Sequence, residues 1–470
     1  MTSARSLSNL ITFRNSQGIQ ARGSLLKLSR TTLIVEVYNP YSIVQLSEVL
    51  NDVEIRSGDR VIYKGRAVVT NLVNTGLMLI VSARLVDTWS DLAGLVGDHT
   101  RIREEVTAFV EDWRESHQIQ PEYQLAVSQI RSFLTELNRW LEHLDLQGDD
   151  YPPDLATQGR DELLEDLSEP LFPQLGEMFE QFEEAAAQVP EEERATHARY
   201  VQRDLHPLLL RAPFVHRAYY KPLGYAGDYE MVNMMLRNDN EGPTTYARII
   251  NSLHLQQGPA QAHRNRIDIL DEWLGEALGE AETNGRPLTG LNVGCGPAVE
   301  LQRLTRSSPA ADRCQLRLID FSDETLNYTR QRLREAAEHS GRSPQFEFVH
   351  ESVHNLLRRA SNPSGESDEH NYDIVYCAGL FDYLSDRVCS RLMRLFFQWI
   401  RPGGRVMVTN VHPSNPAFYR MEHILEWYLI YRDEDHMRQL VPPEWIRRVF
   451  VDHTGINVFM ELEKPIEQDA

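Results

Sequence analysis

The sequence predicts a doubly wound α/β domain in the C-terminal part of the chain, preceded by a small β-barrel and a helical region. Three patterns predict this: short strands up to about Leu85, apolar residues three and four positions apart after Asp98, and alternating strands and helices from Leu291. A chain of 470 residues is also too long for one core, because single cores stop growing at roughly 250 to 300 residues. We therefore expect several domains.

The N-terminal segments that predict strands alternate or cluster β-branched residues, and Gly or Asn-Pro separates them. They are GSLLKLS, TLIVEVY, DVEIRSG, RVIYKGRAVVTNLV and GLMLIVSARL. Strands that are this short and closely spaced favour a barrel. We assign residues 1–97 to it.

The middle of the chain has helical periodicity. TRIREEVTAFVEDWRESH and EYQLAVSQIRSFLTELNRWLEHL predict two amphipathic helices within residues 98–150. The polar stretch QGDDYPPDLATQGRD separates them from residues 151–285, which we interpret as a helical substrate or lid region.

From residue 286 to residue 470 the pattern is typical of βαβ units. The apolar runs LTGLNVGCG, QLRLIDFS, FEFVHES, YDIVYCAGL and GGRVMVTNV are separated by helical segments such as DETLNYTRQRLREAAEH. Such alternation predicts a parallel sheet covered by helices on both faces.

Charge and composition limit the partners and the compartment. A formal net charge of −21 repels polyphosphate, so nucleic acid is not an expected ligand. No apolar run approaches the ~20 residues that a membrane span needs, and the N-terminus lacks the apolar core of a secretory signal. With four widely separated cysteines, these observations predict a cytoplasmic protein with reduced thiols.

The segment LNVGCGPAVEL predicts a ligand site, because an apolar strand leads directly into Gly294-Cys295-Gly296 and then into a helix. Glycines there let the backbone approach a ligand. Twenty-four residues after Gly296, the next strand ends in Asp320, whose carboxylate can accept hydrogen bonds from both ribose hydroxyls of a nucleoside. Glu351 and Ser352 follow the third strand, where they could meet an adenine amine.

These motifs, followed by YDIVYCAGLFDYL and IRPGGRVMVTNV, make the chain similar to class I S-adenosylmethionine methyltransferases, which have a Rossmann-like fold. Nicotinamide enzymes would normally show G-x-G-x-x-G, whereas here PAV follows Gly296. The resemblance implies S-adenosylmethionine (SAM) as cofactor.

By this resemblance, glycines and strand ends surround the cofactor. The methionyl part should lie over Gly294, Cys295 and Gly296, the ribose at Asp320, the adenine beside Phe321, Glu351 and Ser352, and the sulfonium beside Cys377 to Leu380. We add Asn292, at the end of the first strand, to the cofactor-binding residues. Arg266 or Arg264, on the helix before that strand, could pair with the methionyl carboxylate.

A competing motif is His350-Glu351-Ser352-Val353-His354, which matches H-E-x-x-H. On a helix, that spacing holds zinc in metallopeptidases. Here it follows a strand inside a βαβ series, and no third ligand is obvious downstream. We therefore interpret it as a chance match and predict no metal site.

The stretch LHPLLLRAPFVHRAYYKPLGYAGDYEMVNMM is dense in His and Tyr and carries glycines, which favours a lid or substrate pocket over simple helix packing. With YCAGLFDYLSD and MEHILEWYLIYRD, it resembles a bacterial methyltransferase group labelled 3-hydroxypalmitic acid methyl ester biosynthesis proteins. That resemblance implies a small-molecule acceptor, the carboxylate of a fatty acid. An amine or hydroxyl of another metabolite stays open.

The catalytic candidates on the acceptor side are His206, Tyr225, Asp228, Tyr229 and Asp382. A carboxylate is already ionised at neutral pH and needs no general base. An amine or hydroxyl acceptor would need one. The candidates are His206, His216, Asp228, Asp382 and His412.

The N-terminal barrel resembles a PilZ-type domain, a family that often binds cyclic di-GMP through an R-x-x-x-R pair and a D/N-x-S-x-x-G turn. In KLSRTT only Ser29 matches, with Lys27 and Thr32 at the acidic and glycine positions. This favours an interaction or regulatory module that binds a protein partner or a second copy of the chain. The alternative for the whole chain is a signalling adaptor whose methyltransferase fold only senses the cofactor.

Overall fold

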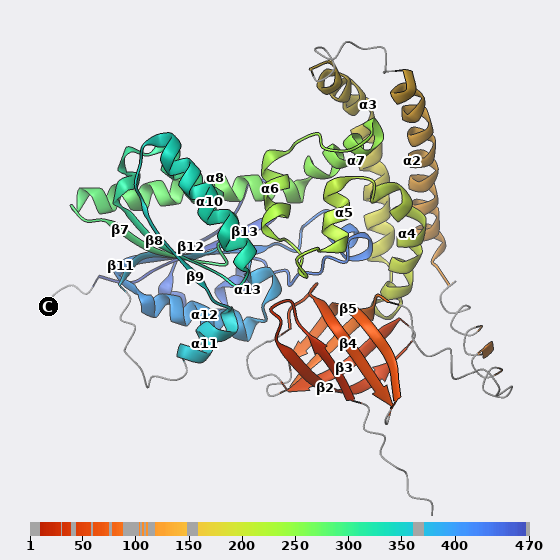
Figure 1. Ribbon diagram of the computed structural model, residues 1–470, viewed down its shortest axis with the longest axis horizontal. Coiled ribbons are helices and arrows are strands. Elements are labelled where there is room, and N and C mark those ends of the chain that lie inside the picture. Colours follow the sequence, from red (N-terminus) through yellow and green to blue (C-terminus); the bar gives the residue numbers. More distant parts are fainter. Residues whose placement is uncertain are drawn as a thin grey trace, which may run out of the picture.

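The computed structural model describes residues 10–87, 118–147, 158–360 and 371–466, except residues 30, 39–43, 58–59 and 75–77, and in addition residues 103, 106, 107 and 110. Three regions follow one another along the chain (Figure 1). They are a β-barrel, a group of helices and a sheet covered by helices, as the sequence predicts.

The barrel consists of antiparallel strands that pair in the order β1-β2-β3-β6-β5-β4 and close through β1 and β4. They are β1 (Leu10–Arg14), β2 (Gln20–Leu28), β3 (Thr32–Tyr38), β4 (Val49–Ser57), β5 (Arg60–Asn74) and β6 (Met78–Leu85). Alternate side chains such as Val35, Val37 and Ile55 fill the interior and are almost fully buried. The predicted barrel is confirmed, and β1 is a strand that the sequence patterns above do not include.

The helical region packs around one apolar core. Its helices are α2 (Pro121–Gln147), α3 (Gln158–Ala187), α4 (Arg194–Leu209), α5 (Pro213–Tyr220), α6 (Tyr229–Arg237) and α7 (Thr245–Leu255), with the short turn η2 (Glu191–Glu193) before α4. The second predicted amphipathic helix corresponds to α2. The first, over residues 100–117, falls largely outside the described residues.

The C-terminal region is built on a sheet of strand order β12-β13-β11-β10-β7-β8-β9. The strands are β7 (Leu288–Val293), β8 (Cys314–Asp320), β9 (Gln345–His350), β10 (Tyr372–Cys377), β11 (Ile400–Val411), β12 (Ile446–Val451) and β13 (Asn457–Glu463). The sheet is mixed rather than entirely parallel, because β13 follows β12 as a hairpin and pairs antiparallel with both β12 and β11.

Helices cover both faces of this sheet, so the predicted doubly wound, Rossmann-like fold is confirmed. One face packs against α8 (Gly258–Thr283), α9 (Val299–Ser307) and α10 (Asp323–Ser340). The other packs against α11 (Val353–Ala360), α12 (Asp386–Trp399) and α13 (Glu434–Arg438). Three short turns lie in the connections between these helices and the strands: η3 (Pro309–Arg313), η4 (Phe381–Tyr383) and η6 (Pro443–Trp445).

One segment of the C-terminal region crosses into the helical region. Residues 413–432 leave β11, pass through the π-helical turn η5 (Arg420–Ile424) beside α4, and return to α13. Met421, Ile424 and Trp427 are buried in the core of the helical region. Residues far apart in sequence therefore form one core, and a cavity lies where the regions meet. Of the helices that the structure describes, none is long and apolar enough to cross a membrane.

Candidate functional site

A cavity opens at the carboxyl ends of β7, β8 and β10, where ligands of open α/β sheets bind. Its floor is the turn between β7 and α9, which begins at Gly294 (φ +69°) and Gly296 (φ +51°). These left-handed conformations favour glycine. A Cβ atom at Gly296 would have no neighbour within 4 Å, so the backbone borders open space in which a ligand fits.

Asp320 ends β8 beside this turn. Its Oδ2 accepts a hydrogen bond from the Gly296 amide (3.2 Å) and its Oδ1 accepts one from the Ser322 amide (3.0 Å). Carboxylate oxygens have two lone pairs each, so both can still accept a hydrogen bond from a ligand in the cavity. Burial raises the pKa of Asp320 to about 6.

The predicted adenine side of the cavity is formed by Phe321 and Glu351, and the Tyr225 ring packs edge-on against Phe321 with centroids 4.9 Å apart. Ser352 has a local structural role: its hydroxyl accepts a hydrogen bond from the Asn355 amide at the start of α11. Ser352 does not line the cavity among the residues that the structure describes.

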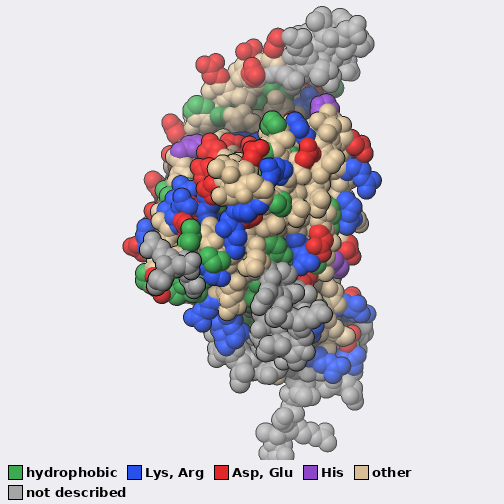
Figure 2. Space-filling model, turned by 90° about the vertical axis from the view of Figure 1, so that its left-hand side faces the viewer, with side chains coloured by type: hydrophobic (Ala, Val, Ile, Leu, Met, Phe, Trp, Pro, Cys, Tyr) green, Lys and Arg blue, Asp and Glu red, His purple; other side chains and the backbone are tan. Residues whose placement is uncertain are grey.

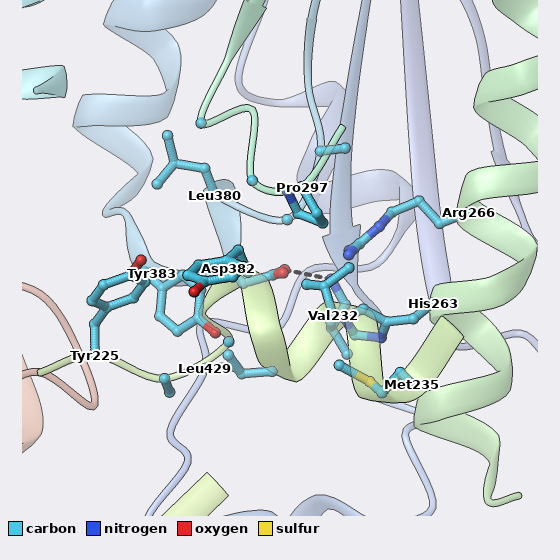
Figure 3. A pocket seen from close by; sticks show the side chains of 18 of the residues that line it. Tyr225, Val232, Met235, His263, Arg266, Pro297, Leu380, Asp382, Tyr383 and Leu429 are labelled. Carbon is cyan, nitrogen blue, oxygen red and sulfur yellow. Dashed lines mark hydrogen bonds between the residues drawn. The ribbon is translucent and has the colours of Figure 1, made fainter. Parts of the chain in front are cut away.

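Arg266 projects from α8 into the cavity (Figure 3). Its side chain is 6% exposed, and its guanidinium lies over Gly379, where a Cβ atom would be 2.9 Å from an Arg266 nitrogen. Within the described part of the chain, no hydrogen bond or ion pair joins this guanidinium to another residue. A buried cation with free donors fits an anionic ligand group such as a carboxylate. Arg264, by contrast, donates to the backbone oxygens of Met235 and Leu255.

Asn292 and Cys295 line the same cavity. Asn292 donates to Glu300 Oε1 (3.3 Å), which also accepts a hydrogen bond from the Tyr376 hydroxyl (2.9 Å). Burial raises the pKa of Glu300 to about 7. Of the predicted segment from Cys377 to Leu380, Ala378, Gly379 and Leu380 line the cavity, whereas Cys377 is fully buried beneath it.

Asp382 points into the cavity from η4, the turn after β10 (Figure 3). Its Oδ1 accepts a hydrogen bond from the Val411 amide (2.7 Å), and burial raises its pKa to about 6. Tyr383 follows, and its hydroxyl accepts a hydrogen bond from Trp427 Nε1 (2.9 Å). The Tyr383 proton is therefore available to a molecule in the cavity.

Arg432, which the sequence does not point to, holds this turn in place. It is fully buried and donates to the backbone oxygens of Phe381 and Leu384, to Asn410 Oδ1 and to Asp386. Because Phe381 opens the turn and Leu384 follows it, Arg432 fixes the position of Asp382 between them.

The predicted lid is a loop between α5 and α6. Tyr225 and Tyr229 line the cavity from it. Gly227 (φ +70°) approaches the Tyr383 hydroxyl so closely that a Cβ atom would lie 2.8 Å from it. Asp228 is directed away: it caps α6 and forms an ion pair with Arg217 (3.0 Å).

His206 also lies apart from the cavity. Its Nε2 is 2.9 Å from the Ile424 backbone oxygen, and its ring packs against Tyr219. Of the five catalytic candidates, the structure thus brings Tyr225, Tyr229 and Asp382 to the cavity. His206 and Asp228 have structural partners elsewhere.

Two histidines that the sequence does not single out line the cavity. His254 on α7 and His263 on α8 each donate from Nδ1 to a backbone oxygen one turn earlier, Ile250 (2.8 Å) and Pro259 (2.9 Å). Burial lowers the pKa of His263 to about 3 and that of His254 to about 4. Both rings are therefore neutral, and each Nε2 can accept a hydrogen bond in the cavity.

The residues of the H-E-x-x-H motif do not share one helix, as the zinc-binding motif of metallopeptidases does. His350 ends β9 and its Nε2 is 2.7 Å from the Phe321 backbone oxygen, whereas His354 lies on α11. Among the described residues, no group of three His, Cys, Asp or Glu side chains could hold a metal ion.

Comparison with known proteins finds a family model that matches part of the C-terminal region. Residues 291–404 match the family model described as methyltransferase domain. The match runs from β7 into β11 and so includes the Gly294 turn, Asp320 and the Asp382 turn. Among curated proteins, none matches the chain.

Several solved structures are similar to this chain. One is a protein from Bordetella parapertussis that is described as a possible exported protein. It has 17% identity and a TM-score of 0.42, and the match covers 60% of this chain and 98% of that chain. A magnesium protoporphyrin IX methyltransferase from Synechocystis PCC 6803 with bound SAH has 14% identity and a TM-score of 0.35, and the match covers 53% of this chain and 98% of that chain. The N-methyltransferase NodS from Bradyrhizobium japonicum WM9, in complex with S-adenosyl-L-homocysteine, has 15% identity and a TM-score of 0.31, with 50% and 98% coverage.

Proposed function

We propose that this chain, whose residues 291–404 match a methyltransferase domain, uses S-adenosylmethionine to methylate an oxygen of an apolar small molecule, the carboxylate of a fatty acid or hydroxy fatty acid. The observation that carries the proposal is the lining of the cavity beyond Asp382. It is largely apolar and comes from α6 and from the crossing segment, where Asn415 and Arg420 are the polar members. The apolar residues are Val232, Met235, Met421, Ile424, Leu425, Trp427 and Leu429. An apolar wall of this kind favours a hydrocarbon acceptor.

The residues present fit SAM. In this proposal the Gly294 turn borders the methionyl part, Asp320 accepts hydrogen bonds from the ribose, and the Arg266 guanidinium pairs with the cofactor carboxylate. When bound, SAM supplies an electrophilic methyl group on a sulfonium. The chain itself orients the cofactor and excludes water, since these side chains are buried.

On the acceptor side, the hydroxyl of Tyr383 can donate to an acceptor oxygen. A carboxylate is ionised at neutral pH, so positioning and removal from water supply most of the catalysis. No general base is required in this reaction.

A hydroxyl or amine acceptor is the second candidate, and Asp382 and His263 favour it. Asp382 has a pKa raised to about 6, which is nearer to neutrality than that of an exposed carboxyl group, so it could take a proton from the acceptor. His263 Nε2 could accept a hydrogen bond from the acceptor and orient it.

Three further observations support a cytoplasmic location and argue against nucleic-acid and nucleotide ligands. The four cysteines are free and buried, which is typical of a reducing compartment such as the cytoplasm. Acidic and basic side chains are interspersed on the face shown in Figure 2, and with a net charge of −21 this disfavours a nucleic-acid substrate. In the barrel, the Ser29 hydroxyl is engaged by Thr32, which disfavours nucleotide binding by a PilZ-like turn.

The test has two steps. SAM and S-adenosylhomocysteine are titrated into the protein by calorimetry, and labelled SAM is then incubated with fatty acids, hydroxy acids and amines. Label in a base-labile ester supports the carboxylate acceptor, whereas label in a base-stable ether or amine supports the second candidate. Binding without transfer to any of them supports the adaptor, and absence of binding contradicts the proposed site.

A further inference from the structure

The N-terminal barrel contributes directly to the cavity. Gln17, from the turn between β1 and β2, and Gln45 and Leu46, from the segment before β4, line the same cavity as Asp320 and Asp382. A module whose only task was to bind a separate partner would not need side chains there.

The barrel is fixed to both elements that enclose the acceptor side. The Val49 amide donates to the backbone oxygen of Gly224 in the lid loop (2.7 Å). Ser47 Oγ donates to the Tyr428 backbone oxygen (3.0 Å) and accepts from the Tyr428 amide (2.5 Å) in the crossing segment. The barrel therefore holds the lid loop and the crossing segment at fixed positions.

A buried carboxylate links the two barrel segments that reach the cavity. Glu48 is 1% exposed and accepts hydrogen bonds from the amide (2.7 Å) and hydroxyl (2.5 Å) of Ser16 and from the amide of Gln45 (2.7 Å). The Gln45 amide makes one of these bonds itself, and Gln17 follows Ser16, which makes the other two. Hydrogen bonds within the barrel thus also fix the part of the cavity wall that the barrel contributes.

The side-chain amides of Gln17 and Gln45 are half-buried, and neither forms a hydrogen bond with another side chain or backbone group in the described part of the structure. An amide can both donate and accept. Two such groups at the barrel wall offer a place for a polar substituent of the acceptor, in addition to the charged and polar groups that the sheet and α8 bring to the cavity.

We propose that the barrel is a wall of the acceptor cavity, and that Gln17 and Gln45 select acceptors by their length and by a polar group distant from the methylated atom. The inference rests on the proposed function, because it assumes that the cavity holds the acceptor. It assigns the barrel to substrate selection in place of an independent signalling role.

The experiment compares Gln45→Trp, which adds bulk to the wall, with Gln20→Trp on the exposed surface of β2. Each full-length variant is first titrated with SAM and unfolded thermally. Two probes then report on the cavity: a dansyl-labelled fatty acid and the uncharged apolar dye Nile red. Methylation of hydroxy fatty acids of increasing length gives the selectivity profile.

We expect Gln45→Trp to bind SAM as the wild type does, to bind both probes at least about tenfold more weakly, and to shift methylation towards shorter acids. Gln20→Trp should match the wild type. Equal probe binding and equal selectivity of the two variants would overturn the proposal. If Gln45→Trp loses SAM binding or unfolds, Gln17→Trp takes its place under the same criteria.

The two proposals fail in different ways. If the wild type methylates no fatty acid but binds Nile red, and Gln45→Trp alone weakens that binding, the barrel wall stands and the fatty-acid acceptor falls. If the wild type binds neither probe, the cavity does not hold an apolar acceptor and both proposals fall.

Discussion

The Asp320 carboxylate accepts backbone hydrogen bonds that shape the Gly294 turn and is the predicted partner of the ribose. Asp320→Ala removes both functions, so it should weaken SAM binding by about 1.5 to 3 kcal/mol, as for hydrogen bonds to a charged group. Asp320→Asn keeps one oxygen acceptor and should fall between the alanine variant and the wild type. Calorimetric titration with SAM measures this order.

The protonation of Asp320 gives a second check of the same site. Because burial raises its pKa to about 6, SAM affinity of the wild type should fall as the pH is lowered through 6, and Asp320→Asn should lack that change. An alanine variant with wild-type affinity would show that the ribose binds elsewhere.

His423 should make the helical core sensitive to acid. It is 2% exposed, and burial lowers its pKa to about 3, so the unfolded chain binds a proton at pH values where the folded chain does not. Its stabilising contribution is complete above pH 6.5 and is lost as the pH falls, by about 2 kcal/mol at pH 5. His423→Phe should remove this part of the pH dependence, because phenylalanine does not titrate. The Tyr123 hydroxyl, which loses its contact with His423, still donates to the His197 backbone oxygen.

Urea unfolding at pH 7.5 and pH 5 measures the effect. His254 and His263 shift stability in the same direction, so the variant should keep a smaller loss between the two pH values. An unchanged loss would contradict the assignment to His423.

At the residue scale, the sequence predicted the residues that one local motif brings together. The Gly294 turn and Asp320 meet because adjacent parallel strands end at one edge of the sheet. Residues that depend on distant packing could not be found in this way: His263 depends on α8 crossing the sheet, and Arg432 reaches a turn some fifty positions earlier. Asp228 resembled a catalytic carboxylate only because helix caps use the same residue type.

The lid loop gives a prediction at the scale of one element. A Cβ atom at Gly227 would meet the Tyr383 hydroxyl at 2.8 Å and Trp427 at 3.3 Å. Gly227→Ala should therefore displace Tyr383 and lower methyl transfer at least about tenfold, with SAM affinity unchanged because the clash is on the acceptor side. Transfer rates and calorimetry on the same variant separate the two effects.

Gly341→Ala is the matched control. Gly341 (φ +66°) ends α10 and has no neighbour within 4 Å of a Cβ atom, so it carries the same backbone cost of about 1–2 kcal/mol without the clash. Equal transfer rates in the two variants would mean that Tyr383 has no role in positioning the acceptor.

At the element scale, long periodic segments were predictable and short connections were not. α2, α10 and the strands from β7 to β11 follow their apolar patterns, since each buries one stripe or both faces. The π-helical turn Arg420–Ile424 has no sequence signature, and Arg420 is held there by Glu183 on α3. β1 is too short to predict, and its pairing with both β2 and β4 gives it its place.

A buried polar cluster joins the barrel, the helical region and the crossing segment, and no local sequence pattern predicts it. Glu426 on the crossing segment is 1% exposed and pairs with Arg84 on β6 of the barrel, and Gln202 on α4 donates to it (3.2 Å). Lys221, at the start of the lid loop, donates to the Leu425 backbone oxygen (3.0 Å). These partners lie more than 200 positions apart in the sequence, which is why the three predicted regions could not be joined in advance.

Arg84→Ala tests whether this cluster holds the barrel on the enzyme. It leaves the Glu426 carboxylate buried without its cation, and removal of one partner of a buried pair costs about 3–5 kcal/mol. Urea unfolding should show that loss, whereas Arg66→Ala, which removes the exposed pair with Asp87, should cost at most about 1 kcal/mol. The double variant Arg84→Met, Glu426→Gln should recover much of the stability, because neither buried group is then charged. Since the barrel borders the cavity, Arg84→Ala should also weaken Nile red binding, measured without urea at a temperature where the variant stays folded. Equal stability of Arg84→Ala and Arg66→Ala would mean that other contacts, such as the hydrogen bonds of the Ser47 hydroxyl and the Val49 amide, suffice to hold the barrel in place.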